Sequence, residues 1–343
     1  MPRKKRDPAI ISDPKVGLIY NLPTKRGSID YMSEADVEDA LRAIKDALRK
    51  MDLQYRSFSL KDRIEPLIKR LKTYKPDVVI NLCEAAYGYS QLEMNVAAML
   101  ELLRIPYTGS PPIALSLGLN KGLSKDVMKA KGIPTPKYQV LNSFKDWNKN
   151  IDYPLFVKPV REDAGLGISK ESFVRNEAEL EKRVKYIIKR YKQQALVEQY
   201  IAGRELNVAI MGKKPRILPV SEIIFKFPKE PKIVDYSAKW IKDSMEYKNT
   251  KPVCPAKLRP SLKNKVERIA LQTYEALHCR DYARIDIRLK GSIPYVLEAN
   301  PNPDISADSG FVRSLKAAGL SFEDFVEEII CLALDRARSG QLY

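Results

Sequence analysis

Two carboxylates and one amide in the segment 283–309 have the residue types and spacing of a divalent-cation site. The segment reads ARIDIRLKGSIPYVLEANPNPDISADS, and its alternation of apolar and polar residues predicts a β-hairpin. With the turn at the Lys-Gly-Ser sequence, Asp286 faces Glu298, and Asn300 lies on the same polar face. Facing carboxylates repel each other, and an all-oxygen ligand set suits Mg²⁺, with Mn²⁺ as an alternative metal.

The hairpin alone leaves a second interpretation open. Its polar face could equally be an exposed sheet surface on which each charge is solvated, because short motifs also match by chance. A magnesium site with so few protein ligands is normally completed by the phosphate oxygens of a nucleotide. The metal interpretation therefore predicts a nucleotide as well.

The composition describes an ordinary globular protein of two or three domains, with 343 residues of which 44% are hydrophobic. A single histidine, His278, and four cysteines without CxxC spacing argue against His-based metal sites, structural zinc and a Ser-His-Asp triad. No apolar run is long enough to span a bilayer, and no apolar segment follows the basic N-terminal residues. We therefore expect a cytoplasmic protein without membrane contact.

The net charge of +17, from 60 Lys and Arg against 43 Asp and Glu, raises the question of nucleic acid. The basic residues are spread along the chain among acidic ones and form no single stripe, which argues against nucleic acid as the main partner. The same positive field would favour a nucleotide and a small acidic substrate. We therefore expect small-molecule partners.

Strands and helices alternate in the first third of the chain, which implies a parallel sheet with right-handed crossovers. Strands are expected at 15–21, 54–60 and 77–82, and helices at 33–51, around 67–71 and at 90–104. Ser33 is expected to cap the first helix, 105–107 to add a short strand, and 109–112 to end the unit. The polar loop after the first strand lacks GxGxxG, so a dinucleotide site is not indicated.

The rest of the chain is α+β in character, with antiparallel strands. Helices are expected at 121–131, 176–191, 262–279 and 321–338, and strands at 155–158, at Ile168, at 195–199 and at 205–211. The segment 228–256 is rich in Lys, Pro and Tyr without periodicity, which is typical of a lid. The predicted fold class is thus α/β followed by α+β.

Along these elements the chain resembles the D-alanine–D-alanine ligases of the ATP-grasp superfamily. The matching blocks, in order, are DVVINL, IPYTGS, LNKGLSK with GIPTP, FVKP with AGLGISK, VEQYIAGRE, VDYSAKW, ARIDIR and VLEANPNP. The resemblance implies the ATP-grasp fold, in which an N-terminal Rossmann-like parallel-sheet domain precedes two α+β domains that sandwich ATP. The implied units are a basic tail 1–14, an N-terminal domain 15–112, a central subdomain 113–204 and a C-terminal subdomain 205–343 with the metal site.

The resemblance implies a nucleotide site. Lys121 and Lys158 match lysines that reach the phosphates, although a plain surface lysine is the alternative for either. A loop with Gly165 and Gly167 would cover the phosphates with backbone N–H groups. The other matches are Glu198, Gln199, Tyr200 and Ile201 at the adenine edge and Glu205 at the ribose. Without the resemblance, the sequence favours plain surface charge for the two glutamates.

The resemblance also implies residues for the chemistry. Lys239 matches a lysine that approaches the γ-phosphate when a lid closes. Arg284 matches an arginine that steadies the substrate and the tetrahedral intermediate, and Ser309 matches a serine that binds the carboxylate of the second amino acid. The implied Mg²⁺ ligands are Asp286, Glu298 and Asn300.

The chain departs from the family pattern around the first substrate. Ala164-Gly165 replaces a Ser-Ser pair, and Cys83-Glu84-Ala85-Ala86 replaces a His-Gly segment. Gly27-Ser28-Ile29-Asp30 replaces a segment whose glutamate binds the first ammonium, and Asp304 replaces an oxyanion-hole glycine. The ATP and metal residues are therefore kept, while the first-substrate pocket is rebuilt. Glu84 and Asp30 are either a new ammonium site or plain polar loop residues.

The leading hypothesis is an ATP-dependent carboxylate–amine ligase that works through an acyl phosphate and releases ADP. A substrate carboxylate attacks the γ-phosphate, and an amine then displaces phosphate to form the amide bond. By analogy with the superfamily, we also expect a homodimer. The alternative is a nucleotide-binding protein without ligase activity that acts on nucleic acid through its basic surface.

Overall fold

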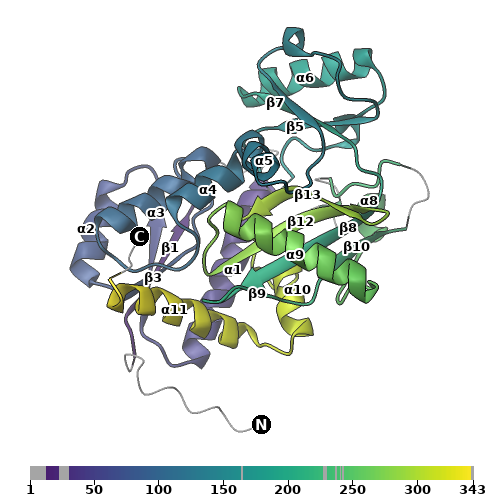
Figure 1. Ribbon diagram of the computed structural model, residues 1–343. Helices are drawn as coiled ribbons and strands as arrows, with labels where there is room; N and C mark the ends of the chain where they lie inside the picture. Colours follow the sequence, from purple (N-terminus) through teal and green to yellow (C-terminus); the bar gives the residue numbers. More distant parts are fainter. Residues whose placement is uncertain are drawn as a thin grey trace.

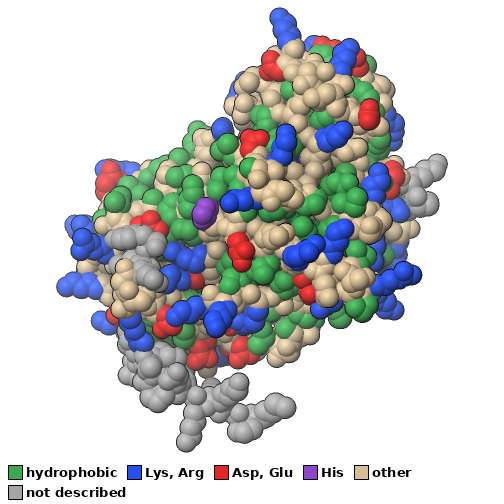
Figure 2. All heavy atoms as spheres, viewed as in Figure 1, with side chains coloured by type: hydrophobic (Ala, Val, Ile, Leu, Met, Phe, Trp, Pro, Cys, Tyr) green, Lys and Arg blue, Asp and Glu red, His purple; other side chains and the backbone are tan. Residues whose placement is uncertain are grey.

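The computed structural model describes residues 13–22, 31–163, 165–226, 230–235, 238–239, 241 and 243–340, and the side chains of 31–36 are outside this description. Three β-sheets follow one another along the described chain, each with its own helices (Figure 1). On the face shown in Figure 2, lysine and arginine side chains are scattered among acidic ones and do not gather into one patch.

The first sheet is parallel, as predicted, with the order β2-β1-β3. Its strands are β1 (Val16–Asn21), β2 (Tyr55–Leu60) and β3 (Val78–Asn81). The helices of this part are α1 (Tyr31–Lys50), α2 (Glu65–Tyr74), α3 (Glu93–Leu102) and α4 (Pro112–Leu119). All four β3 residues are buried, which is expected of a strand covered on both faces.

The second sheet is antiparallel, with the order β4-β7-β5-β6, and α6 lies across it (Figure 1). The strands are β4 (Tyr138–Leu141), β5 (Leu155–Pro159), β6 (Phe173–Val174) and β7 (Ala195–Gln199). The helices are α5 (Lys121–Ala130) and α6 (Glu177–Tyr191). Asn176 caps α6 by accepting from the Glu179 N–H, so this helix starts where its sequence predicts.

The third sheet is the largest, with the order β11-β10-β8-β12-β13 and β9 paired to β8. Its strands are β8 (Arg204–Met211), β9 (Arg216–Ile217), β10 (Ser221–Phe225), β11 (Thr250–Val253), β12 (Tyr282–Lys290) and β13 (Ile293–Asn300). The helices are α8 (Met245–Lys248), α9 (Pro260–Ala276), α10 (Gly310–Ala317) and α11 (Phe322–Arg338). Apolar residues of β8, β12 and β13 pack beneath α9 in one core.

The predicted hairpin register is confirmed, because Arg284 pairs with Asn300 and Asp286 pairs with Glu298. A β-bulge after Asp286 adds one residue to the second arm at Leu297. The strict alternation predicted for that arm puts Leu297 on the apolar face and Val296 on the polar face, and this is wrong: Val296 points into the core, and Leu297 lines a cavity. Sequence periodicity cannot reveal an inserted residue of this kind.

Several element predictions need correction. Ser33 lies inside α1 and does not cap it, because the helix already begins at Tyr31. The segment 105–107 contributes a single bridge from Tyr107 to Val79 and no strand. Ile168 lies in a turn, since its N–H donates to the Gly165 carbonyl oxygen, and the return strand is the short β6. The segment 228–256 holds α8 and β11 among its described residues.

The core beneath the first sheet is shared with the end of the chain. Residues of β1 and α1 pack with Phe311 of α10 and with Phe325 and Ile329 of α11. On the other side, Gly118 of α4 approaches the loop after β13 so closely that a Cβ would lie 2.5 Å from Pro301 Cδ. The first two sheets fall within the predicted ranges 15–112 and 113–204, and the third begins at Arg204, one residue before the predicted range 205–343; the boundaries themselves stay a prediction.

A buried ion pair ties α11 to the junction between the first and third sheets. Asp281 is 3% exposed, and its Oδ2 accepts from Arg336 Nη2 at 2.9 Å and from the Gly109 N–H at 2.8 Å. Arg336 also donates to the Tyr107 carbonyl oxygen at 2.8 Å. One side chain thus holds a carboxylate and a loop of the first sheet together.

Replacing Arg336 with Met should lower the free energy of unfolding by about 3–5 kcal/mol, because Asp281 would keep a buried charge without its partner. Urea denaturation measures this loss. Arg49→Met, which removes an exposed pair with Asp46, is the control and should cost less than about 1 kcal/mol. A loss below about 1 kcal/mol for Arg336→Met would contradict the assignment.

Candidate functional site

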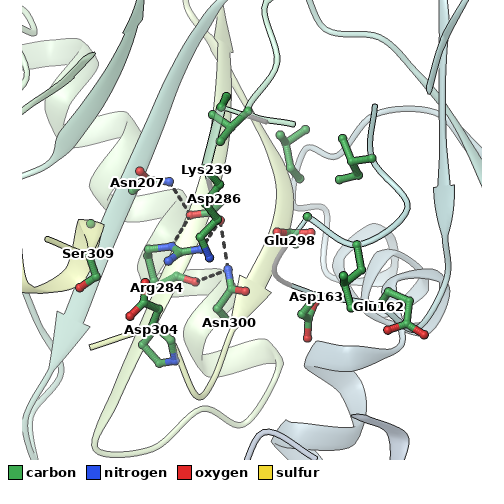
Figure 3. Close-up of a pocket in the computed structure, with 18 of the residues that line it drawn as sticks. Glu162, Asp163, Asn207, Lys239, Arg284, Asp286, Glu298, Asn300, Asp304 and Ser309 are labelled. Carbon is green, nitrogen blue, oxygen red and sulfur yellow. Dashed lines mark hydrogen bonds and ion pairs between the residues drawn. The ribbon is translucent and has the colours of Figure 1, made fainter. Parts of the chain in front are cut away.

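A cavity of about 1270 Å³ lies where the three sheets meet, and residues from all of them line it (Figure 3). Most of the predicted site residues line this cavity. They are Lys158, Gly165, Glu198, Gln199, Tyr200, Ile201, Glu205, Lys239, Arg284, Asp286, Glu298, Asn300 and Ser309. Of the predicted set, Lys121 and Gly167 lie just behind the cavity wall. These roles were predicted from resemblance, and their location in one cavity does not test them.

Asp286 is the most heavily hydrogen-bonded carboxylate of the hairpin. It accepts from Arg284 Nε at 2.8 Å and Nη2 at 2.9 Å, from Asn207 Nδ2 at 2.7 Å and from Asn300 Nδ2 at 3.1 Å. Figure 3 shows these groups converging on one side of Glu298. The pairing pre-orients Asp286, because each of its partners comes from β8, β12 or β13.

The hairpin residues fit a hard divalent cation that is shared with phosphates. Asp286 and Glu298 are cross-strand partners, and Asn300 lies two residues after Glu298 on the same strand. Within the described residues no cluster of three His, Cys, Asp or Glu side chains could hold a metal alone. Two carboxylates and an amide leave coordination positions that phosphate oxygens can fill.

Two buried lysines surround Glu298. Lys121 Nζ and Lys158 Nζ each lie 3.7 Å from Glu298 Oε2. Burial disfavours the charged carboxylate, yet these two ammonium groups hold the pKa of Glu298 at about 2. The carboxylate is therefore ionised at any physiological pH, as a metal ligand must be. Neither lysine is a plain surface residue, since both are at most 5% exposed.

A third lysine, Lys125, lies behind this pair and is fully buried. Its Nζ lies 2.8 Å from Glu198 Oε2, and Lys158 Nζ lies 3.0 Å from Glu198 Oε1. Burial lowers the pKa of Lys125. Burial also disfavours the charged form of Glu198, but the two lysines outweigh this effect, and the pKa of Glu198 is lowered. Glu198 is thus an internal counter-ion, and surface charge is the wrong interpretation for it.

Glu162 and Asp163, which follow β5, contact Lys121. Asp163 Oδ1 lies 2.5 Å from Lys121 Nζ, which also donates to the Glu162 carbonyl oxygen at 2.7 Å. Burial lowers the pKa of Lys121, but Asp163 and Glu298 raise it to a value above the ordinary one. Gly167 packs against the end of β5, where a Cβ would lie 2.6 Å from Pro159 Cγ, and its φ is +72°.

Glu205 and Tyr200, two of the predicted ribose and adenine residues, also line the cavity. Glu205 is paired with Arg288, whose Nη2 lies 2.5 Å from Glu205 Oε2. Burial raises the pKa of Glu205 despite this partner. Tyr200 is buried and contacts Phe173 edge-on with ring centroids 4.7 Å apart. Like Glu198, Glu205 is not a freely solvated surface charge.

The region of the predicted substrate residues contains Arg284, Ser309 and the start of α10. Ser309 caps α10 by accepting from the Val312 N–H at 3.2 Å, so its hydroxyl hydrogen is still available to a ligand. Burial lowers the pKa of Arg284, but Asp286 more than reverses this and the pKa lies above its ordinary value. Both side chains are held in place by the hairpin and the helix.

The departures from the family pattern fall partly outside the described residues. Gly27-Ser28-Ile29-Asp30 and Ala164 belong to the parts that are not described. Glu84 and Asp304 line the cavity. The buried Glu93 of α3 also lines it and accepts from Asn302 Nδ2 at 2.9 Å, which links the first sheet to the loop after β13.

Sequence reasoning missed several residues in and around the cavity. Asn207 shares a face of β8 with Glu205, so the strand alternation already contained its signal. Lys125 lies one helical turn after Lys121, and four-residue spacing could have pointed to it. Glu93, Asp163 and Arg313 carry no local pattern that marks them, because their positions depend on how the three sheets meet.

Comparisons with known proteins agree with this geometry. A family model described as "D-ala D-ala ligase C-terminus" matches residues 127–331. The chain is 37% identical to a D-alanine–D-alanine ligase of Carboxydothermus hydrogenoformans over 73% of this chain and 80% of that protein. It is 29% identical to that of Moorella thermoacetica over 94% and 99% of the two chains. The solved D-alanine–D-alanine ligase of Bacillus anthracis complexed with ATP has the same fold, with a TM-score of 0.76 at 24% identity over 95% of this chain and 99% of that one.

The ionisation of Glu298 gives a prediction on pH-dependent stability. A folded pKa of about 2 lies below the ordinary 4.5, so the charged group stabilises the fold above the ordinary value and loses this effect as pH falls toward 2. The difference in unfolding free energy between wild type and Glu298→Gln should be at most about 3 kcal/mol near pH 7 and shrink as pH falls.

Urea denaturation at several pH values measures this difference. Glu275→Gln on the exposed side of α9 is the control, and its effect should be small at every pH. A difference for Glu298→Gln that does not change with pH would show that Lys121 and Lys158 do not depress the pKa.

Proposed function

We propose that this chain, a member of the D-alanine–D-alanine ligase family of the ATP-grasp superfamily, joins a small carboxylate substrate to an amine through an acyl phosphate. Like the other members of this family, it is an ATP-dependent, ADP-forming ligase. The substrates belong to the class of amino acids and short peptides. Among the helices of the described residues, none has the length and apolar character needed to cross a bilayer. A cytoplasmic location and a homodimer stay predictions.

One observation carries the proposal: Glu298, the cross-strand partner of Asp286, lies 3.7 Å from the buried ammonium groups of Lys121 and Lys158. Carboxylates alone would suit a metal, and lysines alone would suit an anion. Both together suit a metal-bound polyphosphate, because the carboxylates bind the metal cation and the ammonium groups bind the negative phosphate oxygens.

We assign the nucleotide as the resemblance implies. The phosphates bind Lys121, Lys158 and the loop with Gly165 and Gly167, which their burial and positions support. The adenine edge binds the segment Glu198, Gln199, Tyr200 and Ile201, with the Glu198 side chain acting as the counter-ion of Lys125 and Lys158. Glu205 meets the ribose while Arg288 holds it in place.

Asp286, Glu298 and Asn300 would hold Mg²⁺, or Mn²⁺ in its place. When bound, the metal neutralises charge on the phosphates and orients them. The hydrogen bonds that Asp286 accepts hold its carboxylate in place before any metal arrives. Such pre-organisation lowers the cost of binding a cation between two like charges.

The remaining residues serve the acyl transfer. Lys239 supports the γ-phosphate, and Arg284 stabilises the oxyanion that forms when the amine attacks the acyl carbon. Ser309 donates to the carboxylate of the amine-bearing substrate. No nucleophilic side chain is needed, since the acceleration comes from positioning and from charge neutralisation.

The pocket for the first substrate differs from the family pattern in this proposal. Glu84 lines the cavity at the carboxyl end of the first sheet and offers a carboxylate to an ammonium group, while burial raises the pKa of Glu93 well above its ordinary range. Asp304 in place of glycine narrows the space near Arg284. The carboxylate substrate therefore need not be D-alanine, although the relatives named above carry that substrate in their names.

Incubation with MgATP and a mixture of amino acids should release ADP and phosphate, and Glu298→Gln should reduce this rate at least about 100-fold because a metal ligand is lost. Coupled ADP detection and mass spectrometry of the amide product measure both. Glu275→Gln, at a residue that is exposed and does not line the cavity, should retain the wild-type rate. Release of AMP, or an unchanged rate in Glu298→Gln, would contradict the proposal.

A further inference from the structure

Arg313 is a cavity residue to which the sequence comparison gives no role. It lies in α10, one turn after the capping Ser309, and it lines the cavity. Its side chain folds back over the start of the helix, where Nη1 donates to the Asp308 carbonyl oxygen at 2.8 Å. The guanidinium therefore lies beside the N-terminus of α10, at the residue that precedes Ser309.

The guanidinium of Arg313 has unused hydrogen-bonding capacity. Its Nε is buried and has no hydrogen-bond partner in the described part of the chain. Burial lowers the pKa of Arg313, against the opposing influence of Asp308. Asp308 is exposed to solvent, and Asp304 already accepts from the Ser306 N–H at 2.7 Å. A partly buried cation with a free donor calls for an anionic partner.

A second guanidinium approaches the same helix start. A Cβ on Gly310 would lie 3.8 Å from Arg284 Cδ, so the stem of Arg284 passes the first residue of α10. Arg284 is held by two hydrogen bonds to Asp286, whereas Arg313 donates to a neutral carbonyl oxygen. Of the two, Arg313 is thus the one whose charge is left for a ligand.

We propose that Arg313 and Ser309 together bind the carboxylate of the amine-bearing substrate, so that the enzyme selects an amino acid or peptide over a neutral amine. This inference rests on the proposed ligase function. A guanidinium offers a fork of donors that matches a carboxylate, and the first-turn N–H groups of α10 add to the attraction. Arg313 is then a specificity-determining residue that Ser309 alone cannot replace.

A competition assay tests the selection directly. Enzyme, MgATP, D-alanine and D-alaninamide are incubated together, with the two amino compounds at equal concentration. D-alaninamide has no carboxylate, so it can serve only as the amine, and mass spectrometry compares the dipeptide with the dipeptide amide. The wild type should favour the free dipeptide, and Arg313→Met should lower this ratio about 10- to 100-fold.

Two further variants separate recognition from structure. Arg313→Lys should restore part of the ratio, because it keeps the charge but loses the fork. Lys316→Met is the matched control: Lys316 is exposed on the same helix, donates to the Ala307 carbonyl oxygen at 3.0 Å and does not line the cavity. It should keep the wild-type ratio. An Arg313→Met enzyme with the wild-type ratio overturns the proposal, whatever its overall rate.

A binding measurement separates failure of this inference from failure of the ligase function. If the wild type forms neither product, the ligase function fails for D-alanine, and calorimetry then titrates D-alanine into protein saturated with a non-hydrolysable ATP analogue. Wild type should bind D-alanine, and Arg313→Met should bind it at least about 10-fold more weakly. No binding to wild type, or equal binding to both, overturns the role of Arg313.

Discussion

Charge balance inside the cavity is the constraint on which the rest of this structure depends. Three buried lysines, Lys121, Lys125 and Lys158, are neutralised by Glu198 and Glu298 and by the loop residue Asp163. None of these ions could remain buried alone, because an unpaired charge in the interior costs several kcal/mol. The lysines come from α5 and β5, and Glu298 comes from β13. The second and third sheets are therefore held together by the same charges that equip the cavity for a polyphosphate.

The charge network also explains why the hairpin is built as it is. The first strand of the hairpin, β12, is hydrogen-bonded to β8 on one side and to β13 on the other. The backbone of Arg284 and Asp286 therefore has little freedom to move. The bulge at Leu297 turns that side chain into the cavity while Val296 stays in the core. Regular pairing on both sides of one irregular residue thus gives the cavity an apolar wall beside its charged one.

Sequence alone predicted the parts of the site that follow a local period. The hairpin register, and with it the facing of Asp286 and Glu298, came from alternation and a turn. The parallel first sheet came from the order of strands and helices. Glu93, Asp163 and Arg313 could not be predicted, because nothing near them in the chain indicates which other sheet they will meet. The sequence also could not show that Glu198 is buried. A single glutamate in a strand is usually a surface residue, and its two lysine partners become apparent only in the folded structure.

The close approach of Gly118 to Pro301 makes one wall of the cavity a tightly packed contact. With no side chain between them, α4 and the loop after β13 form one packed body, and separating them would break apolar contacts. On the far side, Lys170 reaches Glu246 of α8 through an exposed ion pair of 2.6 Å, which is worth at most about 1 kcal/mol. The contact of Lys170 with α8 therefore costs far less free energy to break than the packing of α4 against the loop after β13.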